Sequence, residues 1–115
     1  MLVKQAADVR LDEVQEGIGI RWVLTKRDGA PNFSLRIIEI ASGVVFAPHQ
    51  HPYEHEIYVL EGQGVVTGQQ GELEMQPGAV LFVAPDELHG YRNTGEVTLK
   101  FICVIPLPNV RKNKS

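Results

Sequence analysis

Residues 43–62 read GVVFAPHQHPYEHEIYVLEG, and this stretch contains the features that decide the fold. Two short runs rich in β-branched and apolar residues, 44–49 and 57–60, stand on either side of a histidine-rich segment. Gly43 and Gly62 bound the pair, and glycine suits turns because it adopts positive φ at no steric cost. Pro52 interrupts the middle segment and cannot continue a paired strand. The stretch therefore predicts two β-strands joined by a turn at Pro52, with His49 and His51 at the end of the first strand and His55 at the start of the second.

Runs of the same kind recur along the chain and are separated by turn signals made of glycine, proline and asparagine. They cover residues 18–25, 33–40, 65–67, 79–83 and 97–105. No stretch sustains an apolar i, i+3, i+4, i+7 pattern over three turns, so no long amphipathic helix is predicted. Many short strands predict an all-β sandwich or barrel with one core. The alternative is an α+β domain with a small N-terminal helix around residues 12–16.

Length and composition limit the classes of protein to consider. The 115 residues are 43% hydrophobic and 22% charged, which is typical of one folded domain. Eleven Lys and Arg against fourteen Asp and Glu give a net charge of −3, whereas a dedicated nucleic-acid-binding domain carries a basic patch. No apolar run approaches the roughly 20 residues of a membrane span, and no signal peptide follows Met1. We therefore expect a cytoplasmic protein that binds neither nucleic acid nor a membrane.

The single cysteine and the C-terminal segment complete the outline of the chain. Cys103 has no second cysteine with which to form an internal disulfide. Residues 1–110 are expected to form one barrel domain. Residues 111–115, which read RKNKS, are expected to form a solvated C-terminal tail.

All four histidines of the chain fall in two places. Three of them lie within residues 49–55, and His89 follows the predicted strand 79–83, from which it could close the group. Because residues i and i+2 of a strand point to the same face, His49 and His51 are expected to project together.

The alternation of side chains along a strand identifies His55 as the better third member of the group. It is in step with Ile57 and Val59, whose alternation is that of inward positions. Glu56 is in step with Tyr58 instead, which makes it the poorer candidate.

The chemistry of imidazole explains why such a group is of interest. Imidazole suits borderline divalent ions from manganese to zinc, and several neutral rings can surround one ion without adding negative charge. A single histidine on an apolar face is more often a core residue, and an H-x-H pair occurs by coincidence on solvated strand ends. Four histidines in two places, with none elsewhere, favour one bound divalent transition metal, Mn, Fe, Ni, Cu or Zn.

The spacing of these residues resembles that of the cupins. The first cupin motif has glycine, H-x-H, a third ligand and a second glycine, and it is matched by Gly43-x5-His49-x-His51-x3-His55-x6-Gly62. The second motif has Gly, Pro, His and Asn, and it is similar to Gly78-x6-Pro85-x3-His89-x3-Asn93. The two motifs and the turn between them cover about half of the chain.

The resemblance implies a single-domain double-stranded β-helix, a jelly-roll barrel, with one divalent metal near the barrel axis. By the motif match, the metal ligands are His49, His51, His55 and His89. His55 replaces the commoner glutamate, as in the small four-histidine cupins that bind manganese or another divalent ion. Pro85 is one residue closer to His89 than usual and Glu87 stands where glycine is common, so the turn near residue 87 is expected to differ.

The number of ligands decides what such a metal can do. Four protein ligands in an octahedral sphere leave two positions for water, dioxygen or substrate, whereas four in a tetrahedral sphere leave none. Replacing a carboxylate by imidazole raises the charge at the metal by one and favours anionic ligands. We therefore expect a metal-dependent enzyme that acts on a small anionic organic molecule. The expected activity is that of an oxidoreductase, such as a dioxygenase, or an isomerase-like activity. The alternative is a non-catalytic ligand-binding or sensor protein whose metal is structural or anchors the ligand.

Four further residues are candidates for substrate binding: Phe101, Cys103, Arg36 and Tyr53. Phe101 and Cys103 share a face of the last predicted strand with Val97 and Leu99, and they would lie near the metal if that face is inward. The interpretation of Phe101 as simple core stands beside this one, and a buried cysteine is usually inert. Arg36 could reach an anionic substrate, although a solvated position on the sheet is the favoured interpretation.

Two further features concern the surroundings of the site and the assembly of the protein. Tyr53 and Tyr91 flank the histidines and are expected at the mouth of the site. Residues that alternate early in the chain are expected to supply an edge for pairing with a second copy. They are Ile18, Ile20, Trp22 and Leu24. Because cupins similar to this chain are often dimers through their N-terminal strands, we expect a homodimer whose other partner is a small-molecule ligand.

Overall fold

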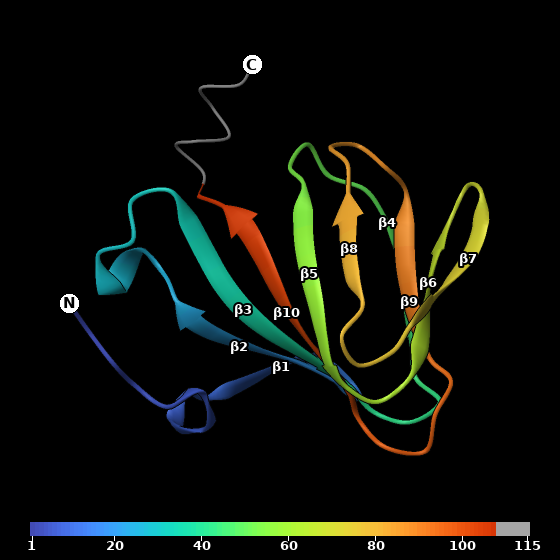
Figure 1. Cartoon of the computed structure of the whole chain (residues 1–115), viewed down its shortest axis with the longest axis horizontal. Coiled ribbons are helices and arrows are strands. Elements are labelled where there is room, and N and C mark those ends of the chain that lie inside the picture. Colours follow the sequence, from blue (N-terminus) through green and yellow to red (C-terminus); the bar gives the residue numbers. More distant parts are fainter. Residues whose placement is uncertain (108–115) are drawn as a thin grey trace.

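The computed structural model describes residues 1–107, and within them the regular structure is β-strand apart from two three-residue 3₁₀ turns. Ten strands follow one another along this part of the chain (Figure 1). They are β1 (Leu11–Gln15), β2 (Ile18–Leu24), β3 (Phe33–Ile40), β4 (Val45–His49), β5 (His55–Glu61), β6 (Gly64–Gly68), β7 (Gly71–Met75), β8 (Val80–Val83), β9 (His89–Asn93) and β10 (Leu99–Pro106). The prediction of an all-β fold is confirmed. The alternative helix around residues 12–16 is wrong, because these residues form β1 and the turn that follows it.

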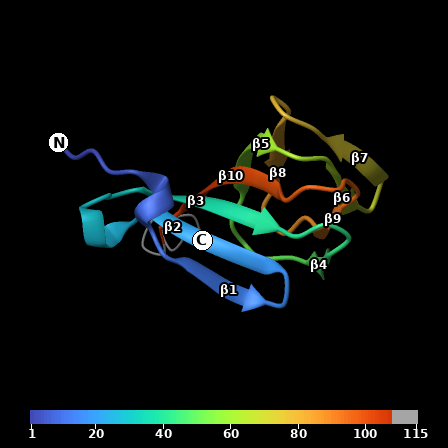
Figure 2. The same ribbon diagram turned by 90° about the horizontal axis from the view of Figure 1, so that it is seen from below.

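The strands form two antiparallel sheets. The larger has the order β1-β2-β3-β10-β5-β8, and the smaller has the order β4-β9-β6-β7. Figure 1 shows β5 and β8 opposite the smaller sheet, so that the two sheets enclose a barrel. Figure 2 shows β1 and β2 continuing the larger sheet beyond the barrel. This is the jelly-roll barrel that the resemblance implies.

The core fills the barrel and is centred on β10. Leu99, Phe101 and Cys103 are fully buried on one face of this strand, where they pack with residues such as Ile40. Burying one large apolar side chain stabilises the fold by about 1.5–3 kcal/mol. The inward face predicted for the last strand is therefore confirmed for these three residues. Val97 precedes β10 and is 63% exposed, so its assignment to the same face is wrong.

Strand β3 turns its arginine to the interior. Its buried residues are Ser34, Arg36, Ile38 and Ile40. Phe33, on the other face, is 60% exposed. Pairing with β10 decides this orientation, because it places Arg36 opposite the inward-facing Cys103. The favoured prediction of a solvated Arg36 is therefore wrong, since this residue is only 7% exposed.

Strand β2 does not present a free apolar edge. Ile18 and Ile20 are buried in the core, whereas Trp22 and Leu24 are exposed. Strand β1 pairs with β2 and occupies the edge of the sheet. The predicted pairing edge is therefore wrong for Ile18 and Ile20, because their side chains face the barrel interior.

The first motif ends at a glycine that the fold requires. Gly62 follows β5 with a φ of 84°, a conformation that L side chains rarely adopt. A Cβ at this position would lie 2.5 Å from the carbonyl oxygen of Thr98 and 2.8 Å from Cα of Leu99. Glycine therefore lets the end of β5 approach the start of β10.

Two further observations concern the extent of the chain. The predicted tail, residues 111–115, lies outside the described residues, as do residues 108–110 of the predicted domain. Within residues 1–107, no helix has the length and hydropathy needed to cross a membrane.

Candidate metal centre

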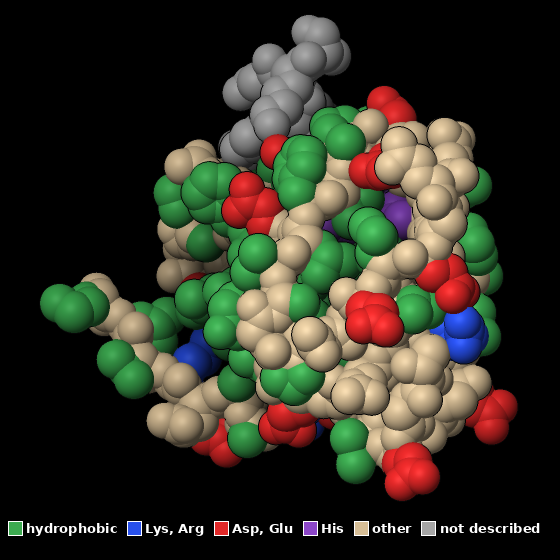
Figure 3. All heavy atoms as spheres, turned by 45° about the vertical axis from the view of Figure 1, so that its right-hand side comes forward, with side chains coloured by type: hydrophobic (Ala, Val, Ile, Leu, Met, Phe, Trp, Pro, Cys, Tyr) green, Lys and Arg blue, Asp and Glu red, His purple; other side chains and the backbone are tan. Residues whose placement is uncertain are grey.

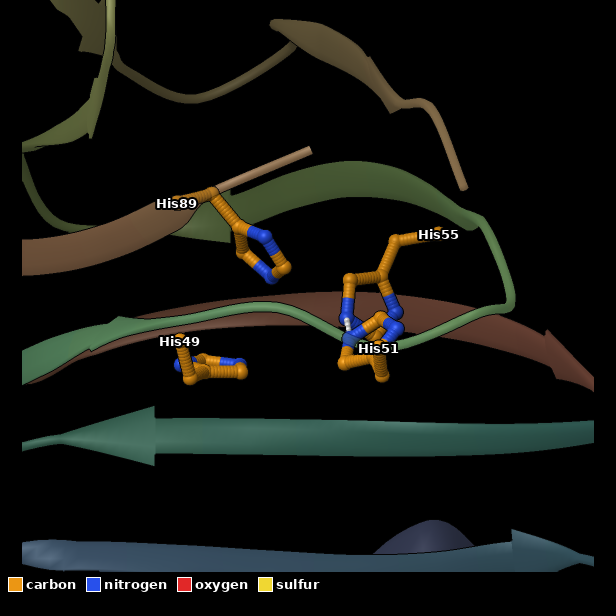
Figure 4. A group of neighbouring side chains, drawn as sticks. All are labelled: His49, His51, His55 and His89. Carbon is orange, nitrogen blue, oxygen red and sulfur yellow. Dashed lines mark hydrogen bonds between the residues drawn. The ribbon is translucent and has the colours of Figure 1, made fainter. Parts of the chain in front are cut away.

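Four separate points of the chain bring the four histidines together (Figure 4). His49 is the last residue of β4, His51 lies in the loop that follows, and His55 and His89 are the first residues of β5 and β9. One ring nitrogen of each lies within 4.8 Å of those of the other three. The predicted convergence of the four histidines is confirmed.

His49 and His51 reach the group from different elements, although the sequence predicted a common strand. Strand β4 ends at His49, and Gln50 and His51 lie in the loop that leads to Pro52. The Asp86 N–H donates to the carbonyl oxygen of His51 at 2.8 Å. This bond ties the loop of His51 to the turn that precedes His89. The rings of His49 and His51 nevertheless lie side by side, with centroids 5.6 Å apart.

His55 takes the inward position that parity predicts. It is 4% exposed, and Ile57 and Val59 on the same face of β5 are also buried. Glu56 is exposed on the outer face of the strand. The preference for His55 over Glu56 as a member of the group is confirmed.

Three of the four rings are oriented by backbone carbonyl groups. The Nδ1–O distances are 3.1 Å for His49 to Ala47, 2.7 Å for His51 to Tyr53 and 2.8 Å for His89 to Glu87. A carbonyl oxygen only accepts, so each of these Nδ1 atoms carries the proton and donates. In a neutral ring, Nε2 then keeps a free lone pair. Histidines that bind metals are usually oriented in this way.

His55 is held by side chains instead. Its Nδ1 lies 3.1 Å from Sγ of Cys103, and Nη2 of Arg36 donates to the same sulfur at 3.0 Å. Its Nε2 lies 2.9 Å from Nε2 of His51. A continuous series of hydrogen bonds therefore runs from Arg36 through Cys103 and His55 to His51.

Burial keeps these rings in the neutral form. Loss of hydration, together with the smaller effect of the nearby Arg36 guanidinium, lowers the pKa of His55 to about 2. Loss of hydration also lowers the pKa values of His51 and His89, although a hydrogen bond to a backbone carbonyl partly opposes the shift in each ring. Neutral imidazole is the form that binds a metal, so these three rings need not lose a charge at pH 7 before binding.

The four residues fit a divalent metal ion. Among residues 1–107, buried Nε2 of His89 has no hydrogen-bond partner, which is costly unless a ligand takes its lone pair. Metal–nitrogen bonds of about 2.0–2.1 Å keep two ligating nitrogens within about 4.2 Å of each other, so a pair of nitrogens 4.8 Å apart must close by at least about 0.6 Å when an ion binds. Because imidazole suits the ions from manganese to zinc, His49, His51, His55 and His89 form a candidate site for one of these metals.

The residues predicted to bind substrate lie around this group at different depths. Arg36 and Cys103 lie behind His55, as described above. The Tyr53 ring stacks on that of His51, with centroids 3.9 Å apart and an interplanar angle of 11°. Phe101 is fully buried in the core. Contact of these four residues with a substrate stays a prediction.

Tyr91 lies deeper than its predicted place at the mouth of the site. It is buried on β9, with its ring centroid 5.7 Å from that of His89. Its hydroxyl has no hydrogen-bond partner in the described part of the chain, and burial raises the pKa of the phenol. The placement at the mouth is therefore wrong, because the side chain of residue 91 points into the barrel.

The turn before β9 contains positioning groups that the sequence did not single out. Asp86, rather than Glu87, has the left-handed conformation, with a φ of 65°. The Glu87 carboxylate accepts from the backbone N–H of Ala84 at 2.9 Å, and the Glu87 carbonyl orients His89. The sequence feature that could have indicated this turn is the missing glycine at position 87. Without that glycine, a neighbouring residue has to adopt the left-handed conformation, and aspartate is one of the few other residues that tolerate it.

A groove between the β6–β7 hairpin and β8 reaches His89. It has a volume of about 340 Å³ and is lined by Val66, Leu81, Val83 and His89, among others. Figure 3 shows histidine at the bottom of a hollow on the side of the molecule that it brings forward. The volume lies in the range of about 300–1,000 Å³ that is usual for small-molecule sites.

Two antiparallel sheets that enclose four inward histidines define a small β-barrel with a candidate metal site. The family model described as "Cupin domain" matches residues 36–105, which is more than half of the chain. The chain belongs to the cupin family.

Comparison with individual proteins gives a consistent result. The structure of the polyketide cyclase RemF from Streptomyces resistomycificus superposes with a TM-score of 0.86 and 32% identity, over 92% of this chain and 79% of that one. The tetracenomycin polyketide synthase protein TcmJ from Streptomyces glaucescens is 29% identical over 106 residues, which are 87% of this chain and 71% of that protein. An oxalate-binding protein from Thermotoga maritima is 38% identical over 60 residues. That match covers 51% of this chain, and the chain spans about half of the length of that relative.

Proposed function

We propose that this protein is a metal-dependent cupin enzyme that acts on a small anionic organic molecule bound beside the four histidines. The expected reactions are an isomerase-like reaction, such as proton transfer or ring closure at an enolisable carbon, and oxygenation. A metal held by the histidines would supply Lewis-acid stabilisation of the developing negative charge.

The charges around the site carry the proposal of an anionic substrate. The four ligands are imidazoles, and a dication bound by neutral rings keeps its full charge. Arg36 adds a buried positive charge, and none of the ion pairs formed within residues 1–107 involves it. Buried charges are costly unless they are paired. A carboxylate, enolate or diketonate would be attracted by both positive groups and would offset part of their charge.

The named relatives support the same chemistry. Two of them are a polyketide cyclase and a polyketide synthase protein, and polyketides contain β-dicarbonyl units that readily form enolates. A third is named for binding oxalate, which is a dicarboxylate. Enolates and carboxylates both present oxygen anions to a cation. For this chain we favour the enolisable substrate, because RemF and TcmJ match most of its length.

The second candidate function is ligand binding without turnover. It is favoured by the similarity to the oxalate-binding protein and by the modest volume of the groove beside His89. In this case the metal would anchor an anion, and no reaction would follow.

Turnover by metal-loaded protein separates the two functions. We would determine the native metal by elemental analysis and then load the protein with Mn, Fe, Ni, Cu or Zn. Each form would be incubated with β-diketones, aromatic poly-β-carbonyl compounds and dicarboxylates, while oxygen consumption and products are measured. Product formation that is lost in a folded His89→Ala variant supports the enzyme. Anion binding without product by every metal form supports the binding protein, and unfolding of His89→Ala supports a structural metal.

A titration tests the anionic character of the ligand. Oxalate and acetylacetonate should change the spectrum of the Cu(II)-loaded protein. We expect Arg36→Met to weaken this binding by about tenfold, which is the effect of losing about 1.4 kcal/mol of charge interaction. Arg92→Met is the matched control, because Arg92 pairs with Glu72 on the surface. A spectrum that neither anion changes would contradict the proposal.

Three further expectations accompany this proposal. Manganese is the metal expected from the resemblance to four-histidine cupins. The cytoplasm is the expected compartment. A homodimer is the expected assembly, and sedimentation at micromolar concentration should then show a particle of twice 12.8 kDa.

A further inference from the structure

His55 differs from the other three ligands in the group that holds its Nδ1. The others face backbone carbonyl oxygens, which can only accept a hydrogen bond. His55 faces the thiol of Cys103, which can donate through S–H and accept at sulfur. The position of the proton on His55 is therefore not fixed by its neighbour, and the rest of the network has to decide it.

The network assigns that proton to Nε2 in the metal-free protein. The Tyr53 carbonyl holds the proton of His51 on Nδ1, which leaves Nε2 of His51 as an acceptor. The 2.9 Å contact between the two Nε2 atoms is therefore a hydrogen bond in which His55 donates. Nδ1 of the neutral His55 ring is then unprotonated, and it accepts from the Cys103 thiol at 3.1 Å.

This arrangement is opposite to the one that a metal requires. A ligand nitrogen must offer a lone pair, and Nε2 of His55 carries a proton that points at His51. His49, His51 and His89 already have the proton on Nδ1. Of the four rings, only His55 has to change its tautomer when a metal enters the site.

We propose that Cys103 is a hydrogen-bond switch that lets His55 change tautomer when a metal binds. The thiol donates to Nδ1 of His55 in the metal-free protein, and its sulfur accepts from Nδ1–H in the metal-bound protein. This inference rests on the metal site of the proposed function. It makes Cys103 a positioning residue for His55 rather than a ligand or a substrate contact.

The protons balance as follows. The proton on Nε2 of His55 leaves to water, and Nδ1 takes up one proton from water. The ring stays neutral, and Nε2 gains the lone pair that the metal needs. The thiol of Cys103 keeps its proton and rotates it away from the ring about the Cβ–Sγ bond.

Arg36 fixes the sulfur in both states. Its Nη2 donates to Sγ of Cys103 at 3.0 Å and can do so whichever way the thiol proton points. The sulfur therefore stays beside Nδ1 of His55 while the direction of their hydrogen bond reverses. A backbone carbonyl in its place would lock the Nδ1–H tautomer, and an apolar side chain would leave Nδ1 without a partner.

Nuclear magnetic resonance of the imidazole nitrogens tests the proposal on the wild-type protein. Long-range ¹H–¹⁵N spectra distinguish the protonated from the unprotonated nitrogen of each neutral ring, and zinc is a diamagnetic probe. We expect His55 as the Nε2–H tautomer with EDTA and as the Nδ1–H tautomer with one equivalent of zinc. The other three rings should be Nδ1–H in both samples. An Nδ1–H tautomer of His55 before zinc is added would overturn the switch.

The same spectra give a different result if the proposed metal site does not exist. If zinc leaves all four rings unchanged, the metal site itself is refuted. The EDTA sample still reports the direction of the hydrogen bond between Cys103 and His55. The two wild-type spectra therefore decide the matter even if a variant does not fold.

Variants of Cys103 connect the switch to metal affinity. Cys103→Ser keeps a group that donates and accepts, and we expect its zinc affinity to stay within about threefold of wild type. Cys103→Ala removes both functions, and we expect zinc affinity to fall by about 10–100-fold. Val59→Ala is the matched control, because Val59 is also fully buried in the barrel core. Equal zinc affinity in the serine and alanine variants would overturn the proposal.

Discussion

His49 and His89 lie in register on adjacent strands β4 and β9, and their ring centroids are 4.4 Å apart. This pair joins the two halves of the candidate metal site, because His49 belongs to the first histidine segment and His89 stands alone forty residues later. The close approach of the strands depends on Gly90. A Cβ at this position would lie 2.8 Å from the carbonyl oxygen of Phe46 and 2.9 Å from the nitrogen of Pro48.

Gly90→Ala is therefore expected to weaken metal binding. The added methyl group would meet backbone atoms, so β4 and β9 must move apart and separate His49 from His89. We expect zinc affinity to fall by about tenfold or more, as when the support of a ligand is lost. Isothermal titration calorimetry would measure it. Gly95→Ala is the control, because a Cβ there has only ordinary contacts at 3.5 Å or more. Wild-type zinc affinity in Gly90→Ala would contradict this account.

The metal-free protein is expected to lose stability as the pH falls below about 6.5. Burial lowers the pKa of His55 to about 2, whereas in the unfolded chain it lies near the ordinary value of 6.5. Between these values the unfolded state binds more protons, so the free energy of unfolding falls with pH. His55 alone contributes about 1.4 kcal/mol per pH unit in this window. His51 and His89 act in the same direction.

Urea unfolding in EDTA at pH 7.5, 6.0 and 5.0 measures this effect. A His55→Gln variant should show a shallower dependence, because its side chain does not titrate. Equal free energies of unfolding of the wild-type protein at pH 7.5 and 5.0 would show that the rings are not held neutral by burial.

Asn93 is expected to matter for stability rather than for metal binding. Its buried amide donates to the carbonyl oxygens of Ile40 and Val97 at 2.8 and 2.9 Å and accepts from Gly95 N–H at 2.9 Å. Asn93→Ala leaves these groups without their partner, and we expect a loss of about 2–3 kcal/mol in the free energy of unfolding. Urea unfolding would measure it. Zinc stoichiometry should stay unchanged, because residue 93 lies at the opposite end of β9 from His89. A loss below about 0.5 kcal/mol would show that water replaces the amide.

Arg36 is expected to lower the stability of the metal-free fold, although its charge favours binding of an anionic ligand. A buried guanidinium without an ion pair carries a desolvation cost, and Arg36 is compensated by the sulfur of Cys103 and by the Trp22 ring, 5.3 Å from its Cζ. Arg36→Met removes the charge and keeps most of the volume. We expect a melting temperature at least as high as that of wild type, measured by calorimetry of the metal-free protein. A clear fall in melting temperature would show that the arginine is chiefly structural.

The sequence by itself determined the strand-rich fold and the histidine group. The short apolar runs between glycine and proline turns predict β-strands, because these residues set the local backbone conformation. Parity alone selected His55 over Glu56, since side chains in a strand alternate with a period of two. The resemblance of the two motifs to those of the cupins implied the jelly-roll barrel and the place of His89 among the ligands.

The pattern of apolar runs did not predict three of the strands, because their own sequences lack such runs. Strands β7 and β9, which read GELEM and HGYRN, are short and rich in polar residues, so they lack the apolar runs that mark a strand. Strand β1 reads LDEVQ, and the alternative helix around residues 12–16 overlapped it. Each is stabilised by pairing with a neighbour, which its own composition does not reveal.

The tertiary structure decided which side of each strand faces the barrel. In the first half of β3, alternation places Arg36 on the polar face opposite Phe33 and Leu35, whereas pairing with β10 turns Arg36 inward and leaves Phe33 exposed. The bond between Arg36 and Cys103 joins residues 67 positions apart, and that between Cys103 and His55 spans 48. Local patterns fix the direction of a side chain relative to its own strand. Which other side chains it meets depends on strands brought together from distant parts of the chain.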